Sequence, residues 1–417
     1  MSGGAPRLLV LGAGREALPV LSALKRLGCQ VVVADGVPDA PGFRVADAGL
    51  LASTFDAEAT VDAARAYASQ TRIDGVLGTA RRVSTAVAAV ADALGLPGTS
   101  PDAARWVADR LALKTRLRAG GVAVPWSAGA RGPSALRQIA AAAREPLVVK
   151  PVDGWAARGV VRLLDGVDFA WAHRVALVSS PSGRVMVEAF THGTRLSMVS
   201  LVAGGAVVTV DVAERSSAAH ERFAPFAIDA GHERPAILSA PERAAVDALL
   251  ERAVSVLALG DGVITTEVVL SRRGPVLADL ELGLVDGRRL AHEVPLASGV
   301  DVVGAAVQLA TGRAPTPADV APRWLRPVAE RAIFGPPGVV VSVRDADRAA
   351  ELDGVTLVDV LVRPGSRVLP PTSNLCHGGA VVAVGQDREE AIARATAAAA
   401  RICIVTTGES SARPSAH

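Results

Sequence analysis

The chain has 417 residues with a formal net charge of +2, and half of them are hydrophobic, a length at which we expect two or three domains. Near-neutral charge without basic runs argues against nucleic-acid binding, and no apolar stretch reaches the roughly 18–20 residues that span a bilayer. Three scattered cysteines and no visible signal peptide lead us to expect a soluble protein of the cytoplasm.

The chain opens with a β-α-β pattern. An apolar strand at 7–11 runs into the turn Gly12-Ala-Gly14-Arg-Glu-Ala17, a helix follows, and a second strand at 31–34 closes on Asp35. This order predicts a parallel unit. The glycines and Asp35 also fit a dinucleotide-binding fingerprint, so an NAD-dependent dehydrogenase is one open alternative.

The next section contains a strand that ends in a lysine. The run Pro146-Leu-Val-Val-Lys150 is apolar up to its last residue, and a loop of mostly small residues, bounded by Gly154 and Gly159, follows it. A buried amine requires an anionic partner. Either a structural acid or phosphate oxygens covered by loop N–H groups would meet that need. A further apolar strand at 185–190 contains Glu188.

Three acids lie on a predicted β-hairpin formed by 263–270 and 276–282. Glu267 is on its first strand, and Asp279 and Glu281 are on its second. Residues i and i+2 of a strand share one face, so we expect the three carboxylates to converge. With no evident basic neighbours they would repel one another, and oxygen-only ligation indicates Mg²⁺ or Mn²⁺. The alternative is a solvated polar face.

The ordered set of these motifs resembles the ATP-grasp carboxylate–amine ligases, and within them the L-amino-acid (dipeptide-forming) ligases. The set also includes Asp109-Arg110, the segment 119–125 and the segment 229–235. The resemblance implies an α/β ATP-grasp fold with an N-terminal Rossmann-like (pre-ATP-grasp) domain. We expect this domain at 1–105, a central lidded subdomain at 106–195, a C-terminal domain at 196–409, and a disordered tail at 410–417. A homodimer is also implied.

The resemblance also implies roles for individual residues. The ATP-binding residues would be Arg110, Lys150, Gly154, Arg158, Gly159, Glu188, Phe190 and Arg195, with 154–159 as a lid over the phosphates. Glu267, Asp279 and Glu281 would hold Mg²⁺ (or Mn²⁺), and Asp229 and His232 would line the substrate pocket. The implied activity is ATP-dependent amide formation between an amino or related carboxylic acid and an amine, through an acyl phosphate.

The chain departs from the family pattern at three positions. Arg110 stands where the family has a lysine, Glu281 where it has an asparagine, and Gly283 where it has an arginine. Arg288, Arg289 or Arg195 could replace the missing arginine. These departures keep open a catalytically inactive nucleotide-binding protein, or a ligase with a different acceptor such as a hydroxyl or a specialised amine of a natural-product pathway.

The neighbouring Cys376 and His377 could suggest a thiol nucleophile with its base. Adjacent side chains on an extended segment diverge, so the pair is interpreted as structural.

Overall fold

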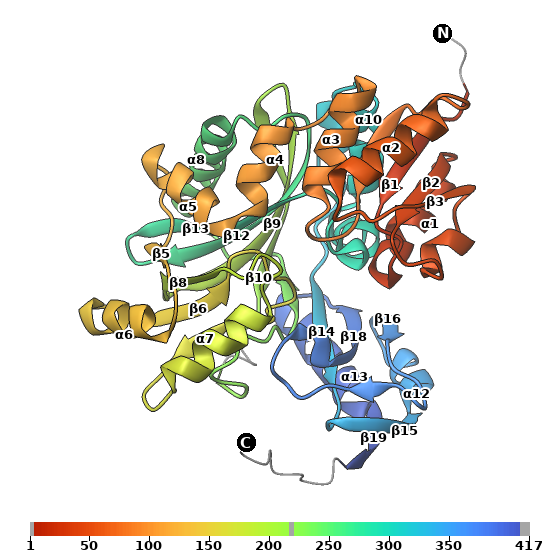
Figure 1. Ribbon diagram of the computed structural model, residues 1–417. Helices are drawn as coiled ribbons and strands as arrows, with labels where there is room; N and C mark the ends of the chain where they lie inside the picture. Colours follow the sequence, from red (N-terminus) through yellow and green to blue (C-terminus); the bar gives the residue numbers. More distant parts are fainter. Residues whose placement is uncertain (1–3, 217–220, 409–417) are drawn as a thin grey trace. The chain divides into compact units, whose positions relative to one another are not determined.

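The computed structural model describes residues 4–216 and 221–408, and Figure 1 follows them along the chain. The chain folds into two compact units, each made of three segments. The first unit contains Met1–Pro125, Thr191–Val212 and Leu238–Leu325, and the second contains Trp126–Phe190, Ala213–Ile237 and Arg326–His417. The expected domain limits stay a prediction, and the expected tail at 410–417 lies outside the described residues.

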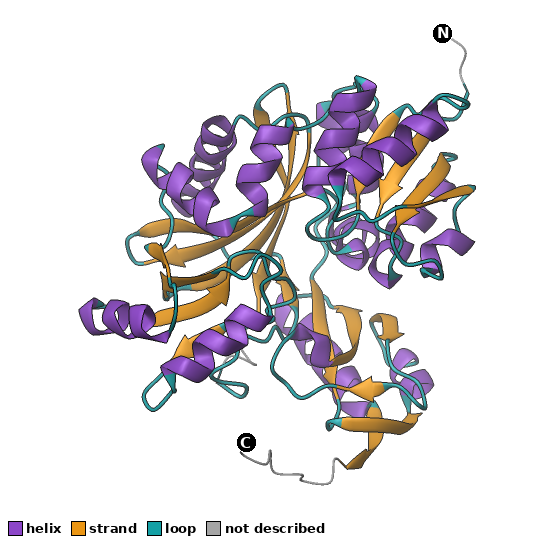
Figure 2. Ribbon diagram, viewed as in Figure 1, coloured by secondary structure: helices purple, strands orange, loops and turns teal. Residues whose placement is uncertain are grey.

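The first unit begins with a parallel sheet in the order β3-β2-β1-β4. β1 (Arg7–Leu11) pairs with β2 (Gln30–Asp35), which confirms the predicted β-α-β unit. Helices flank this sheet (Figure 2), with α1 on one face and α2 and α3 on the other. The remaining bounds are α1 (Leu18–Arg26), β3 (Ala48–Leu51), α2 (Ala57–Ala68), β4 (Gly75–Gly78) and α3 (Ser84–Leu94).

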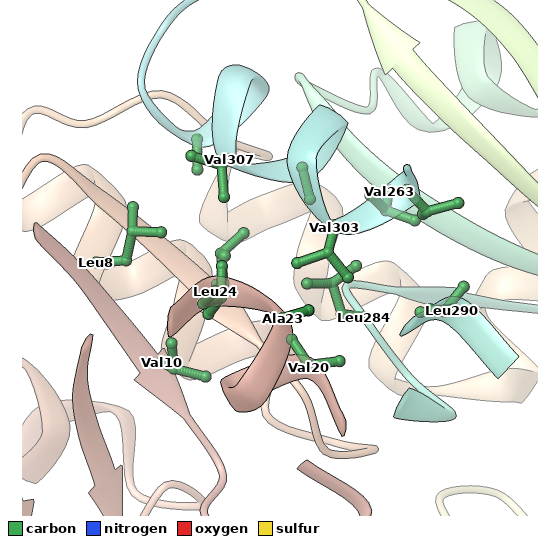
Figure 3. Close-up of a cluster of buried hydrophobic side chains, with 14 of the residues drawn as sticks. Leu8, Val10, Val20, Ala23, Leu24, Val263, Leu284, Leu290, Val303 and Val307 are labelled. Atoms are coloured by element: carbon green, nitrogen blue, oxygen red, sulfur yellow. The ribbon is translucent and has the colours of Figure 1, made fainter. Parts of the chain in front are cut away.

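A hydrophobic core joins this sheet to segments nearly 300 residues later in the first unit. Figure 3 shows side chains from β1 and α1 packed against side chains from the segment 263–307. The labelled members are Leu8, Val10, Val20, Ala23, Leu24, Val263, Leu284, Leu290, Val303 and Val307. Each fully buried aliphatic side chain contributes about 1.5–3 kcal/mol. This packing brings the end of β4 beside the end of β13, where the Leu284 N–H donates to the Gly78 carbonyl at 2.7 Å.

The rest of the first unit is an antiparallel sheet with covering helices. Its strands follow the order β13-β12-β9-β10, and β10 continues past Val212 into the second unit. The bounds are β9 (Thr194–Ala203), β10 (Ala206–Arg215), β12 (Gly262–Ser271) and β13 (Gly274–Leu282). The helices are α4 (Pro101–Ala108), α5 (Arg110–Ala119), α8 (Ala240–Leu257), α9 (Val294–Ser298), α10 (Val302–Ala310) and α11 (Pro317–Val320). Asp109 caps α5 by accepting the Ala112 N–H, which places Arg110 at the first helical position.

The second unit contains a four-stranded sheet in the order β5-β8-β6-β7. The two apolar runs at 146–150 and 185–190 form the predicted strands. β6 is buried throughout and pairs antiparallel with β8. The bounds are β5 (Ser127–Gly129), α6 (Pro133–Ala142), β6 (Leu147–Pro151), β7 (Val161–Leu163), α7 (Phe169–Val178) and β8 (Val185–Ala189).

Two further β layers complete the second unit. The end of β10 pairs with β11, and the order continues β11-β14-β18-β16, while β17-β15-β19 form a smaller sheet. The bounds are β11 (His232–Arg234), β14 (Val328–Phe334), β15 (Gly338–Arg344), α12 (Ala346–Ala350), β16 (Val355–Val360), β17 (Arg367–Val368), β18 (His377–Val384), α13 (Arg388–Arg401) and β19 (Cys403–Gly408). Among the described residues no single helix is long and apolar enough to cross a membrane. In the same described ranges one pair of helices, Arg289–Ser298 and Val302–Ala310, is long and apolar enough when taken together, but the two are bent by 120° at the break between them.

Candidate functional site

Lys150 is the second-last residue of β6, one position before the strand end, and it has an anionic partner within its own unit. Its ammonium Nζ lies 2.7 Å from Oε1 of Glu188 on β8, and both side chains are nearly buried. Because Val148 is paired with Glu188 in the β6–β8 register, Lys150 and Glu188 share one face of the sheet. Two residues predicted from separate motifs therefore come together. The charge that the buried amine requires is supplied here by a carboxylate.

The loop after β6 has the backbone of a tightly held turn. Ala156 and Ala157 adopt positive φ angles of 52° and 56°, a region that costs a non-glycine residue roughly 1–2 kcal/mol. Gly159, at φ +73°, leaves no room for a side chain, since a Cβ there would lie 2.7 Å from Cβ of Ser179. Arg158 stacks on the ring of Trp155 within this loop. The segment 154–159 has the small-residue, glycine-bounded form expected of a lid.

Two other residues predicted to bind ATP, Phe190 and Arg195, lie at the end of β8 and on β9, and their roles stay predictions. The N–H of Phe190 donates to the Pro146 carbonyl at 2.7 Å, and the guanidinium of Arg162 lies 4.6 Å from the Phe190 ring centre. Arg195 lies on β9, paired with Val269 of β12. Arg162 is thus an additional cation on the second unit's small sheet that the sequence reasoning did not single out.

The three carboxylates of the hairpin do share a face. Glu267 on β12 is paired directly with Asp279 on β13, and Glu281 follows two residues later on the same side. The expectation that they have no basic neighbours is wrong. Arg110 Nε lies 2.9 Å from Asp279 Oδ2 and its Nη2 lies 3.8 Å from Glu281 Oε1, and Arg81 also hydrogen-bonds Glu281. Sequence distance concealed these partners, since Arg110 is 169 residues from Asp279 and Arg81 is 200 residues from Glu281.

Arg289 is held in a buried network behind the hairpin. Its side chain is only 2 % exposed and donates to Asp211 at 2.7 Å and to the Ser197 carbonyl at 2.7 Å, with a further hydrogen bond to the Ser197 hydroxyl. That hydroxyl donates to Glu267 Oε1 at 2.9 Å. Arg289 therefore orients Glu267 through Ser197. Its neighbour Arg288 points elsewhere, with Nε 3.5 Å from the buried carboxylate of Glu293.

A metal ion was predicted at Glu267, Asp279 and Glu281. Carboxylate oxygens on one strand face suit a hard divalent cation by their chemistry. As arranged here they do not form such a site: within residues 4–216 and 221–408 no three His, Cys, Asp or Glu side chains gather closely enough to hold a metal ion. Arg110 and Arg81 instead supply the positive charge at two of the three carboxylates. The metal remains a prediction.

Asp229 and His232 belong to one buried cluster in the second unit. His232 Nδ1 lies 3.0 Å from Glu330 Oε2, its Nε2 lies 3.8 Å from Asp229 Oδ2, and Arg215 lies 2.5 Å from Asp229 Oδ2. Burial alone would raise the pKa of Asp229, but the charge of Arg215, then that of His232, and the Gly231 N–H outweigh it and lower the pKa to about 2. Glu330 was not predicted, because a single acid on an apolar strand gives no signal.

Asp35, the acid of the dinucleotide fingerprint, accepts hydrogen bonds from backbone N–H groups of nearby turns. Its two carboxylate oxygens accept the N–H groups of Ala13 at 2.7 Å and Val37 at 2.9 Å. The 3₁₀ helix Pro41–Arg44 packs against the same turn, since the Gly42 N–H donates to the Ala13 carbonyl and a Cβ at Gly42 would lie 2.8 Å from Cβ of Ala13. The groups that would hold a ribose and a pyrophosphate are used internally, which disfavours the dehydrogenase alternative.

Cys376 and His377 are placed as structural residues. Cys376 is 3 % exposed, and burial raises the pKa of its thiol to about 11, so a thiolate is disfavoured near neutrality. The imidazole Nε2 of His377 lies 2.9 Å from the Asp229 carbonyl oxygen, and its ring meets the Phe334 ring edge-on. The two side chains do not act on each other.

Comparison with known proteins gives the class of the fold. The chain superposes on the crystal structure of an L-amino acid ligase from Bacillus licheniformis with a TM-score of 0.80, at 21 % identity, covering 98 % of this chain and 100 % of that one. It also superposes on N5-carboxyaminoimidazole synthetase from Staphylococcus aureus complexed with ADP, with a TM-score of 0.74 at 14 % identity, covering 95 % and 97 %. The fold is the α/β ATP-grasp fold, as predicted.

Sequence comparisons add a finer match. Residues 331–407 match the family model of the L-amino acid ligase C-terminal domain 2. The uncharacterized protein y4rH of Sinorhizobium fredii is 28 % identical over 326 residues, 76 % of this chain and 65 % of that protein. A formate-dependent phosphoribosylglycinamide formyltransferase of Burkholderia thailandensis is 33 % identical over 199 residues, 46 % of this chain and 47 % of that protein. The chain thus spans less than two thirds of the length of these curated relatives. Residues 331–407 are thus similar to an L-amino acid ligase domain, and the chain as a whole has the fold of the ATP-grasp proteins.

Proposed function

We propose that this protein is an ATP-dependent ligase that joins an amino or related carboxylic acid to an amine through an acyl phosphate. The observation that carries the choice among ATP-grasp activities is the match of residues 331–407 to the L-amino acid ligase domain. The substrates would be small molecules, with ATP as the phosphoryl donor. The likeness over the whole chain to a solved L-amino acid ligase agrees with this proposal.

The charges of the second unit suit a phosphate ligand. Lys150 is a cation fixed at a strand end, and the loop 154–159 follows it immediately. A point charge beside loop N–H groups is a common way to hold phosphate oxygens. Bound phosphates would take over the pairing of Lys150 that Glu188 now provides. Glu188 would then be available to a polar edge of the nucleotide, as the family resemblance implies.

The hairpin of the first unit supplies charges of both signs. Arg110 and Arg81 place guanidinium groups on the acidic face, and Arg289 fixes Glu267 from behind. Phosphoryl transfer and attack on the acyl carbon both develop negative charge on oxygen, which fixed cations stabilise without reorganising. Arg110 and Arg81 can act this way. Arg289 is instead committed to Asp211 and Ser197, so Arg110 and Arg81 are the candidates we favour for the role of the arginine that the family has at position 283.

A divalent metal would supply further charge neutralisation at the phosphates when bound. Glu267, Asp279 and Glu281 would hold it only if Arg110 and Arg81 released Asp279 and Glu281. A requirement for a second Mg²⁺ ion, in addition to the one that binds ATP, therefore stays a prediction. Titrating free Mg²⁺ at a constant Mg-ATP concentration would test it.

The experiment that tests the proposal measures ADP, phosphate and amide product with Mg-ATP across a panel of amino acids, singly and in pairs. Formate belongs in the panel because the Burkholderia relative is named formate-dependent. We expect ADP release that needs a substrate, with one phosphate for each amide. Lys150→Ala should lower this rate about 100-fold, the scale of losing one charge that stabilises a transition state.

Lys25→Ala is the matched control. Lys25 is also an ion-paired lysine, but it lies on α1, its partner is Asp47, and both side chains are more than a third exposed. Its activity should match that of the wild type. Equal loss in both variants would contradict the role of Lys150. Bound ATP without ADP release for any substrate tested would favour the inactive nucleotide-binding alternative, and absence of ATP binding would overturn the proposal.

A further inference from the structure

A short turn near the end of the chain contacts two segments that the proposed function uses. The 3₁₀ turn Asn374–Cys376 lies between β17 and β18 in the second unit. The backbone N–H of Asn374 donates to the Ala156 carbonyl in the loop 154–159 at 2.9 Å. Its side-chain Oδ1 accepts the Asp229 N–H, also at 2.9 Å. One residue therefore bonds the lid loop through its backbone and the Asp229 segment through its side chain.

The turn holds the backbone of Asp229 from both sides. Asn374 accepts its N–H, and the imidazole Nε2 of His377 lies 2.9 Å from its carbonyl oxygen. The turn itself is anchored, because Ser373 and Cys376 are buried. Asp229 also pairs with Arg215, so its carboxylate direction depends on a backbone that this turn fixes. A displaced turn would move Asp229 and the lid contact together.

The bond to Ala156 meets the lid at its strained point. Ala156 and Ala157 both have positive φ, and such residues persist where surrounding contacts hold them. Within the loop, Arg158 N–H donates to Trp155 and Val160 N–H to Ala157, while the Asn374 N–H reaches Ala156 from outside. The external bond is thus placed to keep the loop in this conformation.

We propose that Asn374 is a positioning residue that couples the lid loop 154–159 to Asp229. Ordering of one segment then favours ordering of the other. The loop 154–159 is therefore held in place when Asp229 is held in place. This role deepens the proposed ligase function and rests on it for its chemical consequence. A loosened lid would admit water, which attacks the acyl phosphate to give the free acid and phosphate in place of the amide.

Two variants separate the two bonds of Asn374. Asn374→Ala removes the bond to Asp229 and keeps the N–H that reaches Ala156. Asn374→Pro removes both, and proline is tolerated at the first position of a helical turn. Ser373 before it is extended, at φ −164° and ψ 170°, which suits a residue preceding proline. Leu375→Ala is the control, because it alters the side chain of the same turn, which is 38 % exposed, and leaves both Asn374 bonds in place.

The first readout is hydrogen–deuterium exchange without ATP or substrate, so it does not depend on the ligase activity. In Asn374→Pro we expect exchange at 153–160 to rise about fivefold, the scale of one hydrogen bond, with no such change in Leu375→Ala. In Asn374→Ala the peptide 227–232, which contains the Asp229 amide, should exchange faster. If Asn374→Pro unfolds, the Asn374→Ala result alone decides. Two results would overturn the coupling. One is an exchange rate at 227–232 in Asn374→Ala equal to that of the wild type, and the other is an unchanged rate at 153–160 in a folded Asn374→Pro.

The second readout is the number of phosphates released per amide formed. Asn374→Ala should raise this ratio above that of the wild type and of Leu375→Ala, while a purely structural role would lower both products in proportion. An unchanged ratio would contradict the consequence for the lid. If hydrogen–deuterium exchange changes as expected but the protein has no ligase activity, the coupling is supported and the proposed function is contradicted.

Discussion

At the residue scale, Asp229 should make stability depend on pH in the acid range. Its pKa is lowered from 3.8 to about 2, because Arg215 and His232 outweigh the effect of burial. A carboxyl with a lowered folded-state pKa contributes stability that is fully present above pH 3.8 and is lost as the pH falls towards 2. The shift corresponds to about 2 kcal/mol. Asp229→Asn should therefore be less stable than the wild type by about this amount at pH 7.

The measurement is urea unfolding of both proteins at pH 7, 5, 4 and 3. The difference in unfolding free energy should be constant between pH 7 and 5 and should shrink below pH 4. A difference that stays constant down to pH 3 would show that the Asp229 carboxylate is not held by Arg215 and His232 as the structure describes.

The cysteines should differ in reactivity by position. Cys29 and Cys376 are buried, and burial raises the pKa of both thiols, whereas Cys403 is exposed. Thiolate is the reactive form, so native protein at pH 7.5 should take up one equivalent of iodoacetamide, at Cys403. Unfolded protein should take up three, and peptide mass spectrometry identifies the sites. Fast labelling of Cys376 in the native protein would contradict its burial.

Single residues also show where prediction from the sequence stops. Lys150 is identified from its strand and its loop, because both are local patterns, and its need for an anion is met by Glu188. The roles of Arg81 and Glu330 could not be predicted from the sequence, because the partner of each lies about 100 to 200 residues away. The argument from three repelling carboxylates failed for this reason: the sequence shows which charges exist and not which of them meet.

At the element scale, the acidic hairpin depends on a close backbone contact at its end. Gly283 follows β13 with φ +98°, and a Cβ there would lie 2.8 Å from the Gly78 carbonyl oxygen. The neighbouring Leu284 N–H donates to that same oxygen at 2.7 Å. Gly283→Ala should destabilise the protein by about 1–3 kcal/mol, measured by urea unfolding, because the left-handed backbone and the close contact both oppose a side chain.

Gly262→Ala is the matched control for this prediction. Gly262 begins β12 of the same hairpin, and a Cβ there would meet no atom within 4 Å. Its stability should be within about 0.5 kcal/mol of the wild type. Equal effects of the two substitutions would show that the contact with Gly78 is not tight. The same geometry means that any side chain at position 283, an arginine included, would require the backbone at Gly78 or Gly283 to shift.

The elements themselves were largely predictable, because each carries its own pattern. The strands at 7–11 and 31–34 and the hairpin strands at 263–270 and 276–282 all appear where hydrophobic periodicity and turn residues place them. What periodicity cannot supply is the order of the antiparallel strands. β11 has three residues and pairs with β10 and β14 through partners far apart in sequence, so no local signal marks it.

At the scale of the whole molecule, nucleotide binding should be measurable apart from turnover. A ligand that binds only the folded state stabilises it by about 2.7 kcal/mol at a concentration 100 times its Kd. For a chain of 417 residues this corresponds to a rise in Tm of about 3 °C. We expect Mg-ATP to produce such a shift in the wild type and in Lys25→Ala, and expect NADH to produce none. The absence of an NADH shift follows from Asp35, whose carboxylate serves its own turn.

Lys150→Ala should lose most of the ATP-induced shift. The variant leaves Glu188 nearly buried without its cation, so its own Tm will fall, and the quantity to compare is the change that ATP causes in each protein. A full ATP shift in Lys150→Ala would remove Lys150 from the nucleotide site, whatever the activity assay shows. If Lys150→Ala loses the ATP shift and the wild type has no ligase activity, the protein would instead be an inactive nucleotide-binding protein. In the proposed site, Lys150 serves binding, whereas catalysis also requires the charges of the hairpin.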